Sequence, residues 1–262
     1  MRFLENLDKD LRQSVLCALR DLWTHTSTAL EGNTLSLGDT AFVLNEGLTI
    51  GGKPLKDHQE VLGHAKAIEL VYGLMDKPVI DEADLFLIHR AVQIEAISDI
   101  LKPVGDWKKE PNGTYARSPE GKTVYVEYAA PQHVQALMQK WLTLLNGFSR
   151  DLTEAQALKA YAMLHLSFVT IHPFFDGNGR MARLLANLPV LRAGQVPVVI
   201  DCARRQEYIE LLSAYQRVAG QIGQTELIVE NDEYQRFEVF CESCRGLSLE
   251  IVHAAYETQR RR

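Results

Sequence analysis

Residues 172–183 read His-Pro-Phe-Phe-Asp-Gly-Asn-Gly-Arg-Met-Ala-Arg, and the fold of the surrounding chain is best inferred from this stretch outward. Pro173 disfavours α geometry at His172, so an apolar helix that precedes it should end at the histidine. The Asp-Gly-Asn-Gly run at 176–179 is typical of a turn, because glycine adopts positive φ and has no Cβ to obstruct a ligand. A helix beginning directly afterwards would offer its first amides and its positive pole to an anion.

The same twelve residues contain the chemical groups that a transfer reaction needs. His172 can accept a proton, Asp176 offers a hard oxygen ligand, and Arg180 and Arg183 share one helix face. A helix-end histidine or a glycine-rich turn is, taken singly, more often structural. Together with a phosphate-binding backbone they favour metal-assisted phosphoryl or nucleotidyl transfer.

The stretch resembles the Fic family signature, His-x-Phe-x-Asp/Glu-Gly-Asn-Gly-Arg-x-x-Arg. The specified positions correspond to His172, Phe174, Asp176, Gly177, Asn178, Gly179, Arg180 and Arg183. The resemblance covers roughly residues 20–220 and includes Phe168, Ile171, Leu184, Leu185 and Asn187. It implies a mainly α fold, a Fic-fold helical core with a small β-hairpin flap. It also implies transfer of AMP from ATP, with Mg²⁺, to a Ser, Thr or Tyr hydroxyl of a target protein.

The resemblance assigns a role to each position of the motif. His172 would be the general base, with a near-neutral pKa suited to that task. Asp176 would hold Mg²⁺, and the Gly177-Asn178-Gly179 backbone and the Asn178 side chain would bind phosphate oxygens. Arg180 and Arg183 would neutralise the departing β- and γ-phosphates. Arg205 and Tyr208 match a family pattern whose tyrosine lines the adenine pocket, although an ordinary amphipathic helix explains them equally well.

A second motif precedes the first by more than a hundred residues. Ser27-Thr-Ala-Leu-Glu31-Gly32-Asn33 resembles the inhibitory motif Ser/Thr-x-x-x-Glu-Gly/Asn that relatives carry in an N-terminal helix. The resemblance implies that Glu31 pairs with Arg183 and keeps the γ-phosphate of ATP from its productive position. Without the resemblance, Glu31 before Gly32 indicates only a surface residue at a helix end.

Residues 113–128 interrupt the helical pattern with β-branched and aromatic residues around a Pro-Glu-Gly turn at 119–121. This pattern predicts an isolated hairpin, which needs support from the helical core because a lone hairpin is marginal in water. The resemblance makes it the target-docking flap, with the docking residues Thr123, Val124, Tyr125 and Val126. A decorative surface hairpin is the alternative that the residues alone leave open.

Helical periodicity dominates the rest of the chain. An amphipathic stripe runs from Leu4 to Leu22, and Ser36-x-x-Asp39 predicts a helix that ends at Gly47. Further helices are expected over 56–75, 82–101, 131–147, 153–171, 178–193, 205–219 and 232–258. Pro189 should kink the helix that follows the motif. We expect an N-terminal helical region with the inhibitory motif over 1–100, a catalytic core over 101–222 and a helical extension over 223–262.

Composition sets limits on the partners of the protein. Of the 262 residues, 46% are hydrophobic and 24% are charged, which is typical of a soluble globular protein. No apolar run is long enough to span a bilayer and the start lacks a signal-peptide core, so we expect a cytoplasmic protein without membrane partners. The net charge of −6 argues against nucleic acid as a partner.

The sequence thus predicts an autoinhibited protein adenylyltransferase that releases pyrophosphate. Its partners would be ATP and a target protein bearing a hydroxyl residue, and a homodimer is compatible with the sequence. One alternative is the reverse chemistry, removal of AMP from a modified protein, with Glu31 positioning water and His172 acting as acid. Another is a non-catalytic regulator that senses nucleotide at the same site.

Overall fold

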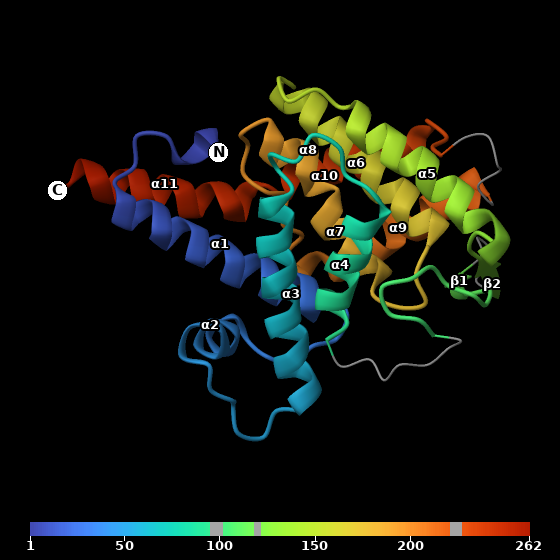
Figure 1. Ribbon diagram of the computed structural model, residues 1–262, viewed down its shortest axis with the longest axis horizontal. Helices are drawn as coiled ribbons and strands as arrows, with labels where there is room; N and C mark the ends of the chain where they lie inside the picture. The colour runs from blue at the N-terminus through green and yellow to red at the C-terminus, as the bar shows by residue number, and fades with distance from the viewer. Residues whose placement is uncertain (95–101, 118–121, 221–226) are drawn as a thin grey trace.

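The computed structural model describes residues 1–94, 102–117, 122–220 and 227–262, and it confirms a mainly α fold with a small β-hairpin (Figure 1). The elements are η1 (Arg2–Leu4), α1 (Lys9–Ala29), α2 (Leu37–Glu46), α3 (Leu55–Gly73), α4 (Glu82–Val92), β1 (Gly113–Arg117), β2 (Thr123–Glu127), α5 (Pro131–Gly147), α6 (Glu154–Ile171), α7 (Asn178–Leu185), α8 (Asn187–Arg192), η2 (Cys202–Arg204), α9 (Arg205–Ala219), α10 (Asp232–Ser243) and α11 (Gly246–Arg260).

Helix α6 lies at the centre of the main hydrophobic core. Its residues are buried on nearly every face, which is the pattern of a helix enclosed by others. Helices α5, α7, α8 and α10 pack against it. Trp141 of α5 buries its ring beside Phe168 and donates its indole N–H to the carbonyl of Leu164 at 3.0 Å. The core thereby fixes the helix that ends at the motif of residues 172–183.

A second apolar cluster joins the two ends of the chain. Helices α1 and α11 lie side by side, and the two termini lie at the same side of the molecule (Figure 1). Leu4 and Leu7 belong to this cluster, but their predicted place in a helix is wrong, since α1 begins only at Lys9. Asn6 has a φ of 63°, which interrupts the helical path before that point.

Three further predicted helices differ from the structure by more than two residues. The helix expected over 178–193 is two helices, α7 and α8, with a break at Ala186; Pro189 lacks the amide that would continue the ladder. The helix expected over 232–258 is also two, because Cys244 and Arg245 separate α10 from α11. Helix α4 ends at Val92, and residues 95–101 of the predicted 82–101 helix lie outside the described residues.

The hairpin is a two-stranded antiparallel sheet that pairs Gly113 with Glu127 and Arg117 with Thr123. The predicted turn at 119–121 lies outside the described residues. Val124 and Tyr125 are exposed, and Val126 is partly buried. In Figure 1 the hairpin lies beside one end of α5, on the side of the molecule away from the termini.

None of the described helices combines the length and the apolar character that a membrane span requires.

Candidate active site

The end of α6 and the start of α7 place the motif in a tight turn. His172 is the C-cap of α6: its amide donates to the carbonyl of Phe168 at 2.9 Å, and its backbone is left-handed with a φ of 52°. Pro173 follows and prevents the helix from continuing. The histidine therefore leaves the helix at the point that the sequence predicts.

The contacts of His172 identify its reactive nitrogen. Nδ1 lies 3.3 Å from the carbonyl oxygen of Val169. Because a carbonyl can only accept, Nδ1 carries the ring proton and Nε2 has the free lone pair. The ring also stacks on Tyr128, with a centroid distance of 3.8 Å and an interplanar angle of 3°. Nε2 is thus the atom available to accept a proton.

The electrostatic environment of His172 differs from the expectation. Burial, with a further contribution from the positive charge of Lys108, lowers the pKa of His172 from 6.5 to about 3. The near-neutral pKa expected for this histidine is therefore wrong for this conformation. An imidazole with so low a pKa is unprotonated at neutral pH, which is the form a base requires.

The turn between the helices is closed by Asn178. Its Oδ1 accepts from the amide of Phe174 at 2.9 Å, and its Nδ2 donates to the carbonyl of Phe174 at 2.8 Å. The side chain expected to bind phosphate is thus engaged within the loop. Gly177 has a φ of 76°, and a Cβ there would lie 2.6 Å from Nε2 of Gln93. The positive φ favours glycine at this position, whereas the Gln93 amide, at the end of a flexible side chain, could shift to admit a Cβ.

Asp176 points outward from the turn and is held from two sides. Gln93 donates from Nε2 to its Oδ2 at 3.1 Å, and Arg180 lies 3.6 Å from the same oxygen. Although desolvation by the neighbouring protein opposes ionisation, these contacts and the Gly177 amide lower the pKa of the carboxyl. The side chain is 72% exposed, so an ionised carboxylate faces the solvent.

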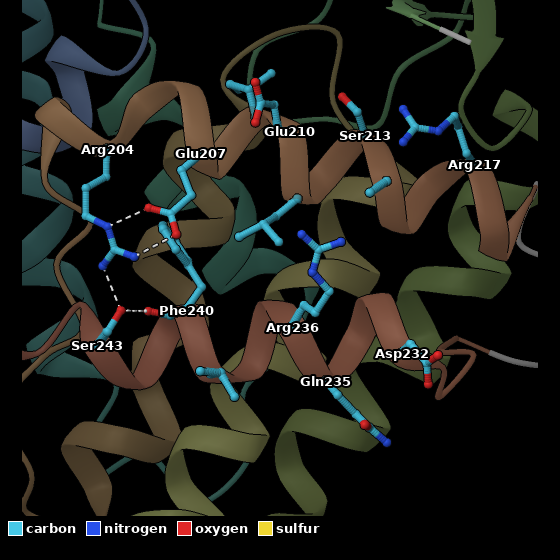
Figure 2. Close-up of a pocket in the computed structure, with 14 residues that line it drawn as sticks. Arg204, Glu207, Glu210, Ser213, Arg217, Asp232, Gln235, Arg236, Phe240 and Ser243 are labelled. Carbon is cyan, nitrogen blue, oxygen red and sulfur yellow. Dashed lines mark hydrogen bonds and ion pairs between the residues drawn. The ribbon is translucent and has the colours of Figure 1, made fainter. Parts of the chain in front are cut away.

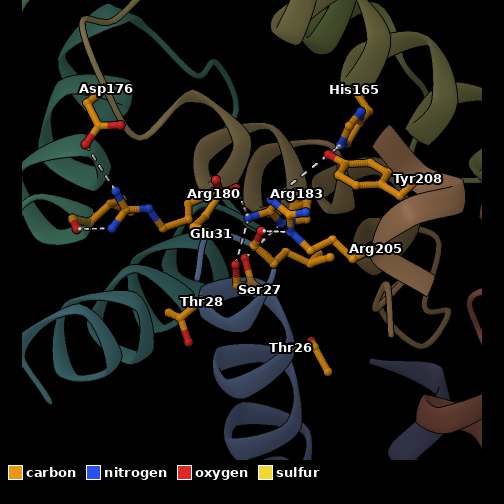
Figure 3. Close-up of polar contacts among 12 residues, drawn as sticks. Thr26, Ser27, Thr28, Glu31, His165, Asp176, Arg180, Arg183, Arg205 and Tyr208 are labelled. Carbon is orange, nitrogen blue, oxygen red and sulfur yellow. Dashed lines mark hydrogen bonds and ion pairs between the residues drawn. The ribbon is translucent and has the colours of Figure 1, made fainter. Parts of the chain in front are cut away.

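The two motif arginines extend in different directions (Figure 3). Arg180 reaches toward Asp176 and donates to the carbonyl of Val92 at 3.3 Å, and its buried Nε has no partner among the described residues. Arg183 is almost fully buried and donates to Glu31 Oε1 at 2.7 Å. It also donates to the hydroxyl and the carbonyl of Ser27, at 2.9 and 2.8 Å.

The structure therefore brings Ser27, Glu31 and Arg183 together. Burial opposes the charge of Arg183, but the facing carboxylate outweighs it and raises the pKa of the guanidinium. A Cβ on Gly179 would lie only 2.5 Å from Glu31 Oε1, so the carboxylate sits directly on the first turn of α7. Gly32 follows with a φ of 101°, which glycine adopts readily. A carboxylate thus occupies the anion-attracting end of this helix.

Arg205 and Tyr208 lie on α9 beside the same region. The Tyr208 hydroxyl lies 3.4 Å from Arg183 and 3.1 Å from Nε2 of His165, and the ring is buried. Arg205 donates to the carbonyl of Leu30, which ends helix α1, at 2.8 Å. Both residues therefore contact the segment around Glu31 or its partner Arg183, and their expected nucleotide contacts stay a prediction.

Several residues near the motif have no signal in the sequence. His89 accepts from the amide of Gly105 at Nδ1, so its Nε2–H donates to the carbonyl of Asp176 at 3.1 Å. Its ring stacks on Phe174. Lys108 is buried close to His172, and burial lowers the pKa of this lysine to about 8. The position of these residues beside the motif is visible only in the folded structure, because they come from segments distant in the sequence.

Comparison with known proteins identifies this arrangement. The family described as Fic/DOC family matches residues 79–190, the stretch from just before α4 into α8. The chain carries a Fic domain. Glu31, Arg205 and Tyr208 lie outside the matched residues of that domain, and the residues that contact Asp176 lie within it.

Relatives of the Fic domain include named protein adenylyltransferases. The chain is 35% identical over 190 residues to protein adenylyltransferase fic-1 of Caenorhabditis briggsae and 31% identical over 189 residues to protein adenylyltransferase Fic of Drosophila erecta. Each alignment covers 71% of this chain and 35% of the relative. The chain thus spans about a third of the length of the curated relatives it matches.

Solved structures resemble this protein over the Fic domain and also over the helices that lie outside it in the sequence. A Fic domain containing signaling protein from Bacteroides thetaiotaomicron superposes with a TM-score of 0.83 at 27% identity, over 97% of this chain and 93% of that one. A fragment of Fic-1 from Caenorhabditis elegans gives a TM-score of 0.72 at 26% identity, over 98% and 68% of the two chains. The helices outside the matched residues therefore have counterparts in these structures.

A surface groove of about 860 Å³ lies between α9 and α10, and no residue of the Fic motif lines it (Figure 2). Both acidic and basic side chains line it, and Arg204 pairs with Glu207 at 2.8 Å while it donates to Ser243 at 2.6 Å. Arg236 pairs with Glu233 at 3.0 Å. These pairs largely neutralise one another, so the groove lacks the concentrated charge of the motif.

Proposed function

We propose that this protein is an autoinhibited protein adenylyltransferase, which transfers AMP from ATP to a Ser, Thr or Tyr hydroxyl of a target protein and releases pyrophosphate. The observation that carries the proposal is the loop between α6 and α7. There Nε2 of His172 has its lone pair free, and helix α7 begins a few residues later. Arg183 of that helix bonds to the carboxylate of Glu31. The adenylyltransferase names of the relatives support the same reaction.

Each residue would contribute to one balanced displacement. Nε2 of His172 accepts the proton of the target hydroxyl, and the hydroxyl oxygen bonds to the α-phosphorus of ATP. The bond from that phosphorus to the bridging oxygen breaks, and pyrophosphate leaves with the electron pair. The first amides of α7, with Arg180 and Arg183, stabilise the negative charge that accumulates on the leaving group.

Mg²⁺ would be held by Asp176. The site fits a hard cation, because the carboxylate is exposed and ionised and its neighbouring Gln93 also carries an amide oxygen. When bound, the ion would neutralise charge on the phosphates and orient them. Asn178 would act by shaping the loop, since its polar groups are engaged with Phe174.

Autoinhibition would follow from the position of Glu31. Its carboxylate lies over Gly179 and bonds to Arg183, where a phosphate group of ATP would otherwise find both the helix N-terminus and the guanidinium. Two anions cannot share that space without strong repulsion. The nucleotide would then bind without placing its γ-phosphate productively.

The reverse reaction, hydrolytic removal of AMP from a modified protein, is the second candidate. One observation favours it: the side chain of Glu31 is 40% exposed although it is paired with Arg183. Water can therefore reach a carboxylate that faces the phosphate site. Release of free AMP from a modified target by the parent protein, but not by Glu31→Gln, would identify this activity.

The decisive experiment for the forward reaction uses the Glu31→Gly protein, ATP and a cell lysate. A mass spectrum that shows AMP on a hydroxyl side chain of another protein would establish both the reaction and the substrate. The parent protein and the His172→Ala variant serve as controls. If nucleotide binds but no adduct forms with Glu31→Gly, the chain is a nucleotide-sensing regulator instead.

The low pKa of His172 predicts a flat response to pH. AMP transfer by the Glu31→Gly protein should not decline through protonation of His172 between about pH 8 and pH 6. A ring with a pKa of about 3 stays in its basic form across this range, whereas a free imidazole would be half protonated at 6.5. Initial rates over the range provide the measurement. A decline with a midpoint near 6.5 would show that the ring is solvated during turnover.

The flap residues Thr123, Val124, Tyr125 and Val126 are proposed to bind a target segment as an added strand. Replacing Val124 and Val126 by proline should abolish modification of an identified target, because proline removes backbone donors and cannot sustain a strand. Self-modification and ATP binding should change much less. The matched control replaces both valines by threonine, which keeps the strand. Equal target modification by the proline variant and the parent would refute the docking role.

A further inference from the structure

Both ends of the flap are attached to the catalytic loop. Ahead of β1, the amide of Lys108 donates to the carbonyl of Pro173 at 2.9 Å. Asn112 donates from Nδ2 to the carbonyl of Phe174 at 3.0 Å. The segment that enters the flap therefore bonds to two carbonyls directly after His172. The flap and the loop form one continuous hydrogen-bonded unit.

The other end of the flap contacts His172 itself. Tyr128, directly after β2, places its ring parallel to the imidazole at 3.8 Å. Its amide extends the hairpin ladder by donating to the carbonyl of Asn112 at 3.0 Å, and its hydroxyl bonds to the side chain of Thr114. Lys108 Nζ lies 6.0 Å from the centre of the Tyr128 ring. The tyrosine ring is thus fixed from its backbone, its hydroxyl and one face.

His172 needs such support. Its contact with Val169 is long, 3.3 Å from Nδ1, and a ring held by one such contact can rotate about its terminal torsion. A parallel ring in van der Waals contact blocks that rotation, because the imidazole cannot turn without colliding with it. The direction of Nε2 therefore depends on Tyr128 as well as on Val169.

We propose that Tyr128 is a positioning residue for His172, through which the base of the flap sets the direction of Nε2. The inference rests on the proposed function for its catalytic meaning, but the contact itself does not. A flap that closes on a target segment would then also hold the base in line with the target hydroxyl. The stack of Tyr128 on His172 would therefore couple binding of the target segment to the orientation of the base.

The stack can be tested without an activity assay. In protein with labelled histidine, the carbon-bound ring protons of His172 should resonate upfield because they lie over the Tyr128 ring. Comparison with His172→Gln assigns these signals among the eight histidines. Tyr128→Leu should move them downfield, whereas Tyr128→Phe should not. Tyr115→Leu removes an exposed ring from the same hairpin and should leave them in place.

Kinetics in the Glu31→Gly background distinguish positioning from simple support of the hairpin. Tyr128→Leu should lower kcat by about tenfold to a hundredfold with little change in the KM for ATP, since only the alignment of the base is lost. Tyr128→Phe should keep most of kcat. Unchanged His172 signals in Tyr128→Leu, or an equal loss of kcat in Tyr128→Phe, would overturn the proposal. If no protein transfers AMP, the function fails, while the resonances still decide whether the stack exists.

Discussion

Replacing Glu31 by glycine is expected to raise AMP transfer by roughly tenfold to several hundredfold. The substitution removes the carboxylate that bonds to Arg183 at 2.7 Å and lies over Gly179. Both the guanidinium and the first turn of α7 then become available to the γ-phosphate. Incorporation of radiolabelled AMP, measured for parent and variant at the same nucleotide concentration, gives the effect directly.

The gain should depend on Arg183. Arg183→Ala alone should be weakly active, and the double variant should be no better, because two residues that act through one contact are not additive. Glu46→Gly is a matched control: Glu46 is likewise a helix-end glutamate followed by glycine, but it is exposed and forms no ion pair with the motif. Activation that persists without Arg183 would rule out this intramolecular inhibition.

Replacing His172 by alanine should abolish AMP transfer while leaving ATP binding nearly intact. The imidazole moves a proton, whereas the helix N-terminus and the arginines bind phosphate. Titration calorimetry with ATP and Mg²⁺ measures the binding, and circular dichroism checks that the variant is folded. His253→Ala, which changes an exposed histidine on α11, is the control. A folded His172→Ala protein that no longer binds ATP would show that His172 has a different role.

The sequence predicted most of the fold because its signals are local. Helical periodicity located the helices, and β-branched and aromatic residues around a turn located the hairpin. The bounds of α5 and α9 agree with the prediction. Pro189 indicated the interruption after the motif. The break at Cys244 and Arg245 was missed, and the side chain of Arg245 there contacts distant residues: it pairs with Glu154 and donates to Gln195. No local pattern encodes such a contact.

The candidate site also contains residues that the sequence predicts and residues that only the folded structure reveals. His172, Asp176 and the glycines follow one another in the chain, so their spacing alone indicates their chemistry. His89, Lys108 and Tyr128 act through packing between segments far apart in sequence, and each would be unremarkable in its own neighbourhood. The low pKa of His172 was missed for the same reason, because burial is a property of the folded molecule.

The left-handed backbone of His172 has a consequence for stability. A residue with a side chain at a φ of 52° is less stable than glycine would be there, by about 1 kcal/mol. That strain persists because the bond from Lys108 to Pro173 and the ring of Tyr128 hold the turn from both sides. The protein therefore trades part of its folding stability for an imidazole at this position. A more stable loop and a working base are competing requirements on one residue.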